Sequence, residues 1–196
     1  HMLALSTDRR RIYCSNMTAG SVSAFDFATG KKLADIPTGK APCTILVVAR
    51  SRWEDDYRWV IAYGAPSQLQ SRGIGVDRNG PLSLSAYGDD LVSAPPAGDK
   101  NHDGQWDAGE ILVVTGLWEK GTIRGWANGT PTTTPSRQGD FNTLPTAGFI
   151  GCQTHGREYW KGAICEVLIY DRALAEEERQ GVERPLMEKW LGPAGR

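Results

Sequence analysis

The sequence predicts an all-β protein built as a sandwich of two antiparallel sheets, with short helices at its C-terminus. Short stretches of alternating or wholly apolar residues follow one another between positions 43 and 170, and turn residues separate them. The chain also contains 23 glycines and 11 prolines, which suit many turns, and 7 tryptophans, which suit pleated sheet surfaces. About ten strands joined by short turns are typical of a two-sheet sandwich.

The length and the charge of the chain limit its function classes. Its 196 residues predict a single domain over residues 1–196, in which His1 and Met2 look like a cloning scar. Apolar residues make up 40% and charged residues 23%, so a soluble fold with a real core is expected. The net charge of −1 argues against a nucleic acid partner, and no apolar run approaches the roughly 20 residues of a membrane span.

The predicted strands differ in how clearly the sequence marks them. Apolar residues in "EILVVTGLW" (110–118) lie on both faces, which predicts a central strand. "TIRGWANGT" (122–130) contains Asn128-Gly129, a pair that favours a type I′ hairpin turn. Residues 130–143 are polar and rich in proline and threonine, which predicts a loop. Further strands are expected in "CTILVVARSRW", "YRWVIAYG", "RGIGVDRNGPLSLSAYGDD", "TAGFIGC" and "WKGAICEVLIYDR".

The stretch that follows the last strand predicts two short helices. Three consecutive glutamates at 176–178 favour the N-terminus of the first helix. Pro185 is expected to end that helix and to begin a second one, which Gly192 stops. The residues then expected to face the sandwich are Leu174, Val182, Leu186 and Trp190.

Residues 3–42 contain two strand patterns, "SVSAFDF" and "KLADI", around the turn "ATGKK". This segment resembles one blade repeat of YVTN-type β-propellers over about residues 5–42. A propeller needs typically four or more blades, and no second copy follows here. The segment is therefore expected to supply strands joined to the sandwich, and the alternative is that it is the end of a propeller in a longer protein.

The run "EYWKGAICEVLIYDRALAEEERQGVERPLMEKWLG" resembles the tail of bacterial LamG-like domains, which belong to the concanavalin A-like lectin/glucanase superfamily. "IRGWANGT" and "PCTILVVAR" resemble a hairpin and an early strand of the same family, so the resemblance covers about residues 40–192. The matching positions in the tail are Gly162, Ile164, Glu166, Tyr170, Arg172, Leu174, Glu178 and Trp190.

The resemblance implies a concanavalin A-like, two-sheet antiparallel jelly-roll sandwich. It does not fix a ligand, because this fold hosts sugar binders, protein binders and glycosidases. One position departs from the family pattern. Ala175 stands where the family often has Ser or Thr to cap the helix, so the helix start is expected to fray or shift.

The segment "DKNHDGQWDAGE" (99–110) has the ligand spacing of a calcium loop. Oxygen-bearing groups fall at the six ligand positions of a twelve-residue EF-hand loop, and Gly104 takes the sixth place, where the chain turns sharply. Calcium takes six to eight oxygen ligands, so this set suits it. The predicted ligands are Asp99, Asn101, Asp103, Gln105 through its backbone carbonyl, Asp107 and Glu110.

The surroundings of this loop do not predict an EF-hand domain. Pro95 and Pro96 stop any helix before it, and a β-branched run follows it. A calcium loop between two strands is therefore expected, with a polar solvated turn as the alternative. The ion is expected to hold a long connection in place, and its alternative role is to shape a ligand site.

Glu166 in "EVLIYD" is the carboxylate that resembles a glycosidase position. Family 16 glycosidases of this superfamily carry several carboxylates on one face of one strand, and a retaining pair lies about 5 Å apart. Here Leu168 and Tyr170 share the face of Glu166, and Asp171 points the other way. A structural role for Glu166, held by Arg172 or by backbone amides, is expected, and no catalytic residue is assigned.

Aromatic side chains near strand ends are the candidates for sugar binding, because a sugar ring stacks its C–H face on an indole or phenol ring. Trp118, Trp126 and Trp190 lie in apolar patterns that predict core positions instead. His155 lies in a loop that either lines a ligand edge or only connects two strands. The candidate ligand-binding residues are Trp53, Trp106, His155, Tyr159 and Trp160.

Cysteine usage leaves two alternatives open. Cys14, Cys43, Cys152 and Cys165 fit no zinc motif, because no Cys-x-x-Cys pair is present. They either form two disulfides in an exported protein or remain buried thiols.

These observations predict a non-catalytic binding or adhesion module, extracellular or on the cell surface, that one calcium ion stabilises. Carbohydrate is the first choice of ligand, by analogy of fold. The alternatives are a protein-interaction or scaffold domain appended to a larger secreted protein, and a glycoside hydrolase of the concanavalin A-like superfamily.

Overall fold

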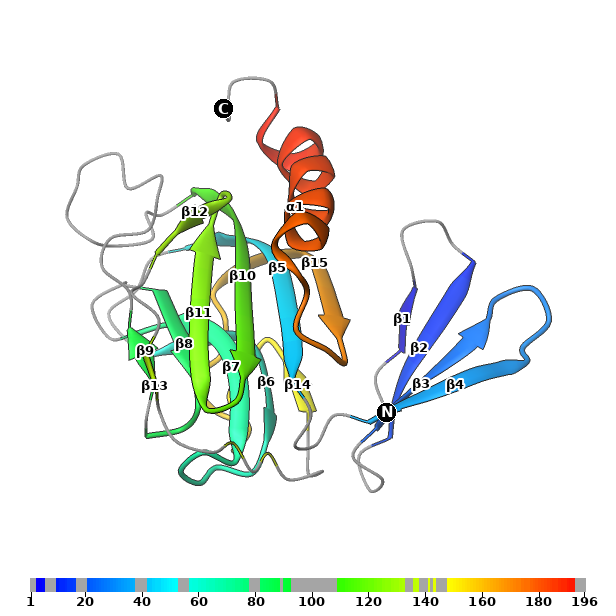
Figure 1. Cartoon of the computed structure of the whole chain (residues 1–196), viewed down its shortest axis with the longest axis horizontal. Coiled ribbons are helices and arrows are strands. Elements are labelled where there is room, and N and C mark those ends of the chain that lie inside the picture. The colour runs from blue at the N-terminus through cyan, green and yellow to red at the C-terminus, as the bar shows by residue number, and fades with distance from the viewer. Residues whose placement is uncertain are drawn as a thin grey trace.

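The computed structural model describes residues 3–5, 10–16, 21–37, 42–52, 57–77, 82–88, 90–92, 109–132, 136–137, 141, 143 and 148–192. These residues form three antiparallel β-sheets and one helix (Figure 1). Two of the sheets stack as the layers of a sandwich and enclose a common core, which confirms the predicted fold class. In the described part of the chain, no helix has both the length and the apolar character that a membrane span requires.

The first layer is organised around β5 (Cys43–Ser51), whose residues are buried on both faces of the sheet. Ile45 and Val47 point into the core between the layers, whereas Leu46 and Val48 point to the helix on the outer side. A continuous apolar run is what a strand buried on both faces requires. The strands across this layer are β12 (Thr130–Pro131), β11 (Thr122–Ala127), β10 (Ile111–Glu119), β5 (Cys43–Ser51) and β15 (Gly162–Tyr170), and β13 (Ser136–Arg137) also pairs with β11.

Two tight turns in this layer follow the chemistry of their residues. Asn128 and Gly129 have φ values of 49° and 77°, which confirms the predicted type I′ turn after β11. Lys120 and Gly121, with φ values of 46° and 73°, turn the chain from β10 to β11 in the same conformation. The expected loop at 130–143 contains two short strands, β12 and β13, because both find hydrogen-bonding partners on β11.

The second layer closes the core from the other side. Ile74, Leu82 and Leu84 are fully buried between the layers. Trp118 of the first layer reaches across and donates its Nε1–H to the Ser85 carbonyl at 3.0 Å. The strands across this layer are β14 (Gly148–Ile150), β6 (Arg58–Gly64), β7 (Ser71–Val76), β8 (Leu82–Ser85) and β9 (Leu91–Val92).

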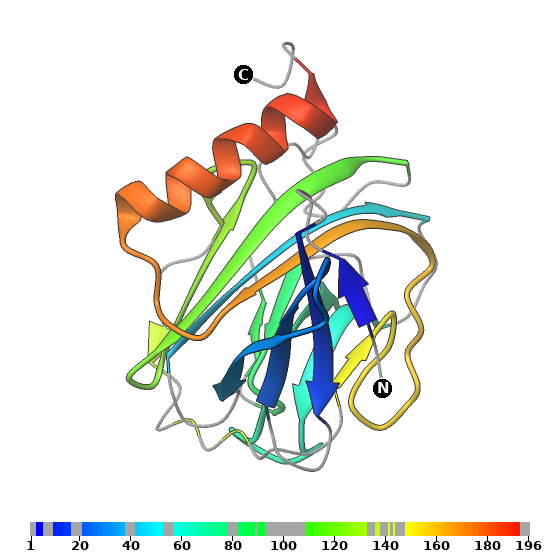
Figure 2. The ribbon, with the colours of Figure 1, turned by 90° about the vertical axis from the view of Figure 1, so that its right-hand side faces the viewer.

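Helix α1 (Glu176–Leu191) lies across the outer side of the first layer (Figure 2). Leu174 and Leu186 are buried against Leu46, Val48 and Val113, and the partly buried Val182 and Trp190 pack beside them. The predicted inward face of the C-terminal segment is therefore confirmed. The prediction of two helices is wrong, since one helix runs through Pro185.

Polar contacts made by residues before and after Pro185 explain why α1 stays continuous. Before the proline, Arg179 donates to Glu183, and Thr115 of β10 donates to the same Glu183 carboxylate at 2.5 Å. The Arg179 guanidinium also stacks 4.2 Å from the centroid of the Trp126 ring. After the proline, Lys189 and Trp190 anchor the last turns on β15. A proline removes one helical hydrogen bond, and these contacts outweigh that loss.

The start of α1 is held without a capping side chain at Ala175. The Glu178 carboxylate reaches back and accepts a hydrogen bond from the Ala175 amide at 3.0 Å. Arg172 holds that carboxylate with two further hydrogen bonds, of 2.6 and 2.8 Å, and these bonds lower the pKa of Glu178. The helix begins at Glu176, so the expected fraying at Ala175 is not observed.

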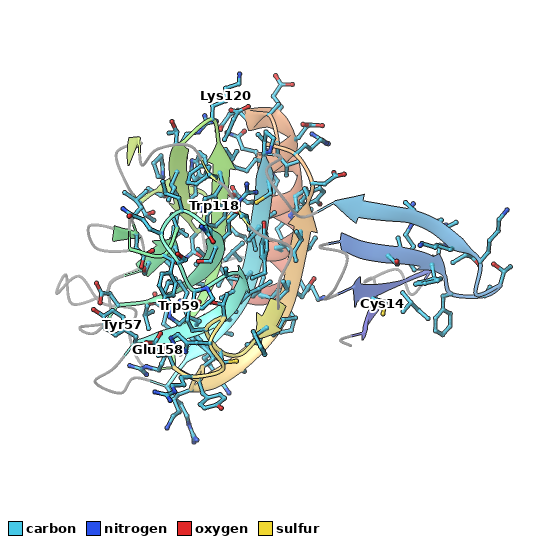
Figure 3. The ribbon with its side chains drawn as sticks, turned by 90° about the horizontal axis from the view of Figure 1, so that it is seen from below. Cys14, Tyr57, Trp59, Trp118, Lys120 and Glu158 are labelled. Carbon is cyan, nitrogen blue, oxygen red and sulfur yellow. The ribbon has the colours of Figure 1, made fainter. Side chains whose placement is uncertain are left out.

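The third sheet is made of the N-terminal strands in chain order, β1 (Leu3–Leu5), β2 (Arg11–Asn16), β3 (Ser21–Asp26) and β4 (Lys32–Pro37). Asp26 fixes the turn between β3 and β4, because its carboxylate accepts hydrogen bonds from the amide and the hydroxyl of Thr29. Figures 1 and 3 show this sheet beside the sandwich. The described strands pair with one another, as short turns between consecutive strands allow. That this segment forms one domain with the sandwich stays a prediction.

Candidate functional site

One rim of the sandwich brings together strand ends that are far apart in the sequence. The Arg52 amide donates to the Lys161 carbonyl at 2.6 Å, which joins the end of β5 to the start of β15. The Gly109 amide donates to the Ser51 carbonyl at 2.7 Å, so the last residues of the acidic segment reach the same place. Arg58 Nη1 donates to the Arg52 carbonyl at 2.7 Å and adds the start of β6. The end of β5 and the start of β15 lie on the right-hand side of Figure 2.

Residues 151–161, named here the Tyr159 loop, cross this rim between β14 and β15. Three backbone hydrogen bonds of 2.8 Å close the loop on itself: Trp160 N to Gly151 O, Gln153 N to Arg157 O, and Gly156 N to Gln153 O. The Gly151 amide also donates to the Val60 carbonyl at 2.8 Å, and Tyr159 forms a bridge with Trp59. The backbone of the loop is therefore fixed on β6.

Glu158 is the side chain that anchors the loop from within. Its Oε2 accepts a hydrogen bond from Trp59 Nε1 at 2.8 Å, and its Oε1 lies 3.7 Å from His155 Nε2. Glu158 has a φ of 58°, an unfavourable conformation for a residue with a side chain, which the surrounding contacts must hold in place. Trp59 is 2% exposed, and Figure 3 shows it next to Glu158.

The end of the Tyr159 loop alternates between outward and inward side chains. Arg157, Tyr159 and Lys161 are exposed, whereas Glu158 is half-buried and Trp160 is buried. Tyr159 is 61% exposed, and its hydroxyl donates to the Gly156 carbonyl at 2.8 Å. The phenol ring is thus held at its far end while much of its surface remains accessible.

The predicted ligand-binding residues have different places in the structure. Tyr159 and His155 are exposed on the loop, as a binding role requires. Trp160 is 9% exposed and belongs to the core between the layers, so its ring offers little surface to a sugar. Trp53 and Trp106 lie outside the described residues. Trp118 and Trp126 are buried, which confirms the prediction of core positions for both.

The predicted calcium loop lies almost wholly outside the described residues. This holds for Asp99, Asn101, Asp103, Gln105 and Asp107, while Glu110 is half-buried just before β10. Among the residues that the structure does describe, no group of three or more His, Cys, Asp or Glu side chains converges on a metal position. Calcium binding therefore stays a prediction.

Glu166, the carboxylate at the glycosidase-like position, serves the docking of α1. Its Oε1 accepts hydrogen bonds from Lys189 Nζ and from Trp190 Nε1, each 2.5 Å long. The expected partners were Arg172 or backbone amides. Arg172 instead pairs with Glu178 across the helix start, because both side chains extend along the same exposed surface.

The four cysteines are buried or partly buried thiols. None of the four forms a disulfide, although all four lie within the described residues. Cys43 Sγ lies 3.2 Å from the Tyr63 hydroxyl inside the core, and Arg72 Nη1 donates to that hydroxyl at 3.5 Å. Burial raises the pKa of Tyr63 well above its usual value. This polar cluster is enclosed between the layers and is separate from the rim.

Sequence reasoning placed Arg157 and Glu158 in a loop that could line a ligand edge but gave them no role, and it missed Trp59 and Lys161 as parts of the rim. The contact between Trp59 and Glu158 joins positions 99 residues apart, and no local pattern reveals such a pair. The alternation in "REYWK" (157–161) was a usable signal, because it separates Arg157, Tyr159 and Lys161 from the inward Glu158 and Trp160.

Comparisons with known proteins agree with this architecture. The laminin G-type family model described as Concanavalin A-like lectin/glucanases superfamily matches residues 35–178. That match begins inside β4, and the propeller-like resemblance of residues 5–42 finds no support. No curated protein sequence matches the chain.

Three solved structures illustrate the likeness of fold. CBM40 of the Ruminococcus gnavus IT-sialidase, bound to α2,3-sialyllactose, has a TM-score of 0.56 at 14% identity, with 73% of this chain and 83% of CBM40 covered. The second structure is domain 4 of AbnA, a GH43 extracellular arabinanase from Geobacillus stearothermophilus, in complex with arabinotriose. It has a TM-score of 0.53 at 14% identity, with 92% of this chain and 80% of that domain covered.

The third is a Bacteroides ovatus protein assigned to carbohydrate binding, with a TM-score of 0.54 at 14% identity and 72% of this chain covered. The chain spans 40% of the length of that protein. At such low identities these likenesses concern the fold, and the site has to be argued from its own residues.

Proposed function

The chain belongs to the concanavalin A-like lectin/glucanases superfamily, and from this premise we propose that it is a non-catalytic carbohydrate-binding module. The observation that carries the proposal is the exposed Tyr159 ring, fixed on a loop with an ordered backbone. An aromatic ring offers an apolar face on which a sugar can stack its C–H groups. CBM40 and AbnA domain 4, which share the fold, were solved with sialyllactose and arabinotriose respectively.

The geometry of the loop favours binding in a second way. A sugar that stacks on Tyr159 meets a ring whose hydroxyl is already bonded to Gly156, in a loop fastened to β6 through Gly151 and Glu158. Little conformational freedom is then lost when the ligand binds, so more of the contact energy contributes to affinity.

A non-catalytic role agrees with the engagement of Glu166. Lys189 and Trp190 both donate to its carboxylate, so this group stabilises α1. Most glycosidases use two carboxyl groups that face the same glycosidic bond. We therefore propose binding without bond cleavage for this chain.

Calcium is part of the proposal, with Asp99, Asn101, Asp103, Gln105, Asp107 and Glu110 as ligands. The spacing of these residues supports it, since a twelve-residue loop with glycine at the sixth place suits a hard cation. The hydrogen bond between Gly109 and Ser51 supports a position next to the rim. An ion there would hold the connection to β10 in a fixed shape beside the Tyr159 loop.

An extracellular or cell-surface location is proposed on the basis of the ligand class. AbnA, one of the proteins that share the fold, is an extracellular enzyme. Disulfides give this proposal no support, because none of the four cysteines forms one.

A glycan array probed with the calcium-loaded protein tests the proposed function. We expect binding to a limited set of glycans, and Tyr159→Ala should weaken that binding by about tenfold or more, as the loss of an aromatic anchor does. Phe27→Ala is the matched control, because Phe27 is 53% exposed but lies in the turn that follows β3 in the N-terminal sheet. A blank array for the wild-type protein, or equal losses in both variants, refutes the proposal.

A further inference from the structure

Resting on the proposed carbohydrate function, we infer that the Tyr159 loop selects acidic sugars, those that carry a carboxylate or a sulfate group, over neutral ones. The starting observation is the pattern of exposed side chains around the ring. Arg157 and Lys161 stand two residues before and two residues after Tyr159, and all three side chains are exposed. Glu158 and Trp160, between them, point inward. Along this segment, the exposed side chains are therefore a cation, an aromatic ring and a second cation.

A third cation reaches the same surface from another strand. Arg52 follows the end of β5, and its side chain is exposed. Its amide donates to the Lys161 carbonyl at 2.6 Å, so the two backbones are in direct contact. Two positively charged residues from segments distant in the sequence thus lie side by side two residues after Tyr159, and Arg157 lies two residues before it.

The carboxylate of the Tyr159 loop does not compete for these cations at the surface. Glu158 is the acidic residue within residues 151–161. Its carboxylate accepts the hydrogen bond of the buried Trp59 indole at 2.8 Å and lies beside His155. The Glu158 carboxylate, 29% exposed, is therefore already engaged by Trp59 and His155, whereas the Arg157 and Lys161 side chains extend outward.

Each group of this surface has a defined role toward an acidic sugar. The sugar ring stacks on Tyr159, and an acidic substituent on one side of that ring reaches Arg157. A guanidinium group binds a carboxylate or a sulfate through two parallel hydrogen bonds, which fixes orientation as well as affinity. Lys161 and Arg52 offer the same substituent a second position at the opposite edge. A neutral sugar makes the stacking contact alone.

Calorimetry with lactose, 3′-sialyllactose and 3′-sulfolactose tests this selectivity on the calcium-loaded protein. The three probes share one disaccharide. Lactose carries no acidic group, 3′-sialyllactose carries a carboxylate, and 3′-sulfolactose carries a sulfate. We expect at least one acidic probe to bind about tenfold more tightly than lactose at low ionic strength, with the advantage shrinking in high salt. The comparison of the two acidic probes tells which group the site prefers.

The double substitution of Arg157→Gln and Lys161→Gln identifies the residues responsible. It should remove most of the preference for the acidic probe and leave the affinity for lactose unchanged, because Tyr159 remains. Lys120→Gln is the matched control, since it removes one exposed positive charge in the turn after β10, far from Glu158 in Figure 3. Tyr159→Ala should instead weaken the binding of all three probes.

The outcomes separate this inference from the function on which it rests. Equal affinities for lactose and both acidic probes, or a preference that survives the double substitution, overturn the inference and leave carbohydrate binding standing. The inference is also overturned if neutral glycans on the array bind and acidic ones do not. If no glycan of either class binds, the proposed function fails and the inference fails with it.

Discussion

Replacing Glu183 with leucine is expected to lower the free energy of unfolding by about 3–5 kcal/mol. The Arg179 and Glu183 side chains are each 2% exposed, so the substitution removes the buried carboxylate partner of the guanidinium, which keeps its hydrogen bonds to the exposed Glu176. Thr115 loses its carboxylate acceptor at the same time, beneath α1. Urea denaturation followed by tryptophan fluorescence measures the change, since Trp126 lies in contact with Arg179.

Two further variants show whether the buried charge is the cause. Arg179→Met combined with Glu183→Leu removes both charges and should recover most of the lost stability, because apolar side chains of similar volume replace a buried ion pair at little cost. Glu177→Gln, an exposed position on the same helix, should change the free energy by less than about 0.5 kcal/mol. A Glu183→Leu protein within about 1 kcal/mol of the wild type would show that apolar packing alone docks α1.

Removal of calcium is expected to lower the melting temperature by about 8–16 °C when the free ion is at about 1,000 times its dissociation constant. At that excess, binding to the folded state alone contributes about 4 kcal/mol. Calcium should stabilise the folded state, because the unfolded chain cannot hold the six ligand positions together and so does not bind the ion. Scanning calorimetry of the chelator-treated protein, with and without added calcium, measures the shift.

Glu110→Gln tests the ligand set of the same loop. Glu110 takes the twelfth position, where a carboxylate supplies both oxygens, so the amide should weaken calcium binding strongly and abolish most of the thermal shift. Added magnesium should stabilise the wild-type protein less, because it demands a smaller octahedral site. A titration of the chelator-treated protein that releases no heat, together with an unchanged melting temperature, removes the calcium proposal.

The sandwich itself could be predicted from the sequence because its signals are local and periodic. Alternation and apolar runs mark β5, β6, β7 and β10, and Asn128-Gly129 marks a hairpin turn. Short two-residue strands such as β12 and β13 escaped prediction, since a polar, proline-rich segment forms them only where a neighbouring strand offers its edge.

The helix shows where local rules lose to tertiary contacts. Pro185 predicts a break, and Ala175 predicts a frayed start, when each is judged by its own propensity. The helix is continuous because Glu166 binds its last turns and Glu183 binds its first half to the sheet. Its start is ordered because Arg172 positions Glu178 under the Ala175 amide. Glu183, Arg172 and Glu178 lie close in sequence to Pro185 or Ala175, whereas Thr115 and Glu166, which hold the helix on the sheet, are distant in sequence.

The candidate site was predictable only in part. Composition and position marked Tyr159 and Trp160 equally, and only burial separates them, because one ring faces solvent and the other completes the core. The anchoring of Glu158 by Trp59 depends on the approach of two distant strands, which the sequence does not express. The sequence shows positively charged residues on both sides of Tyr159. They indicate a positively charged surface only once the inward direction of Glu158 is known.

Backbone amide NMR of the calcium-loaded protein, titrated with the glycan that binds best on the array, tests the proposed binding site most directly. We expect shifts that concentrate in residues 155–161 and extend to Arg52 and Trp59, which share the rim. The indole Nε1–H signal of Trp59 should move with them, because Glu158 holds it. Shifts confined to the exposed face of α1 or to the N-terminal sheet, with the Tyr159 loop unchanged at saturation, would contradict a binding site on this rim.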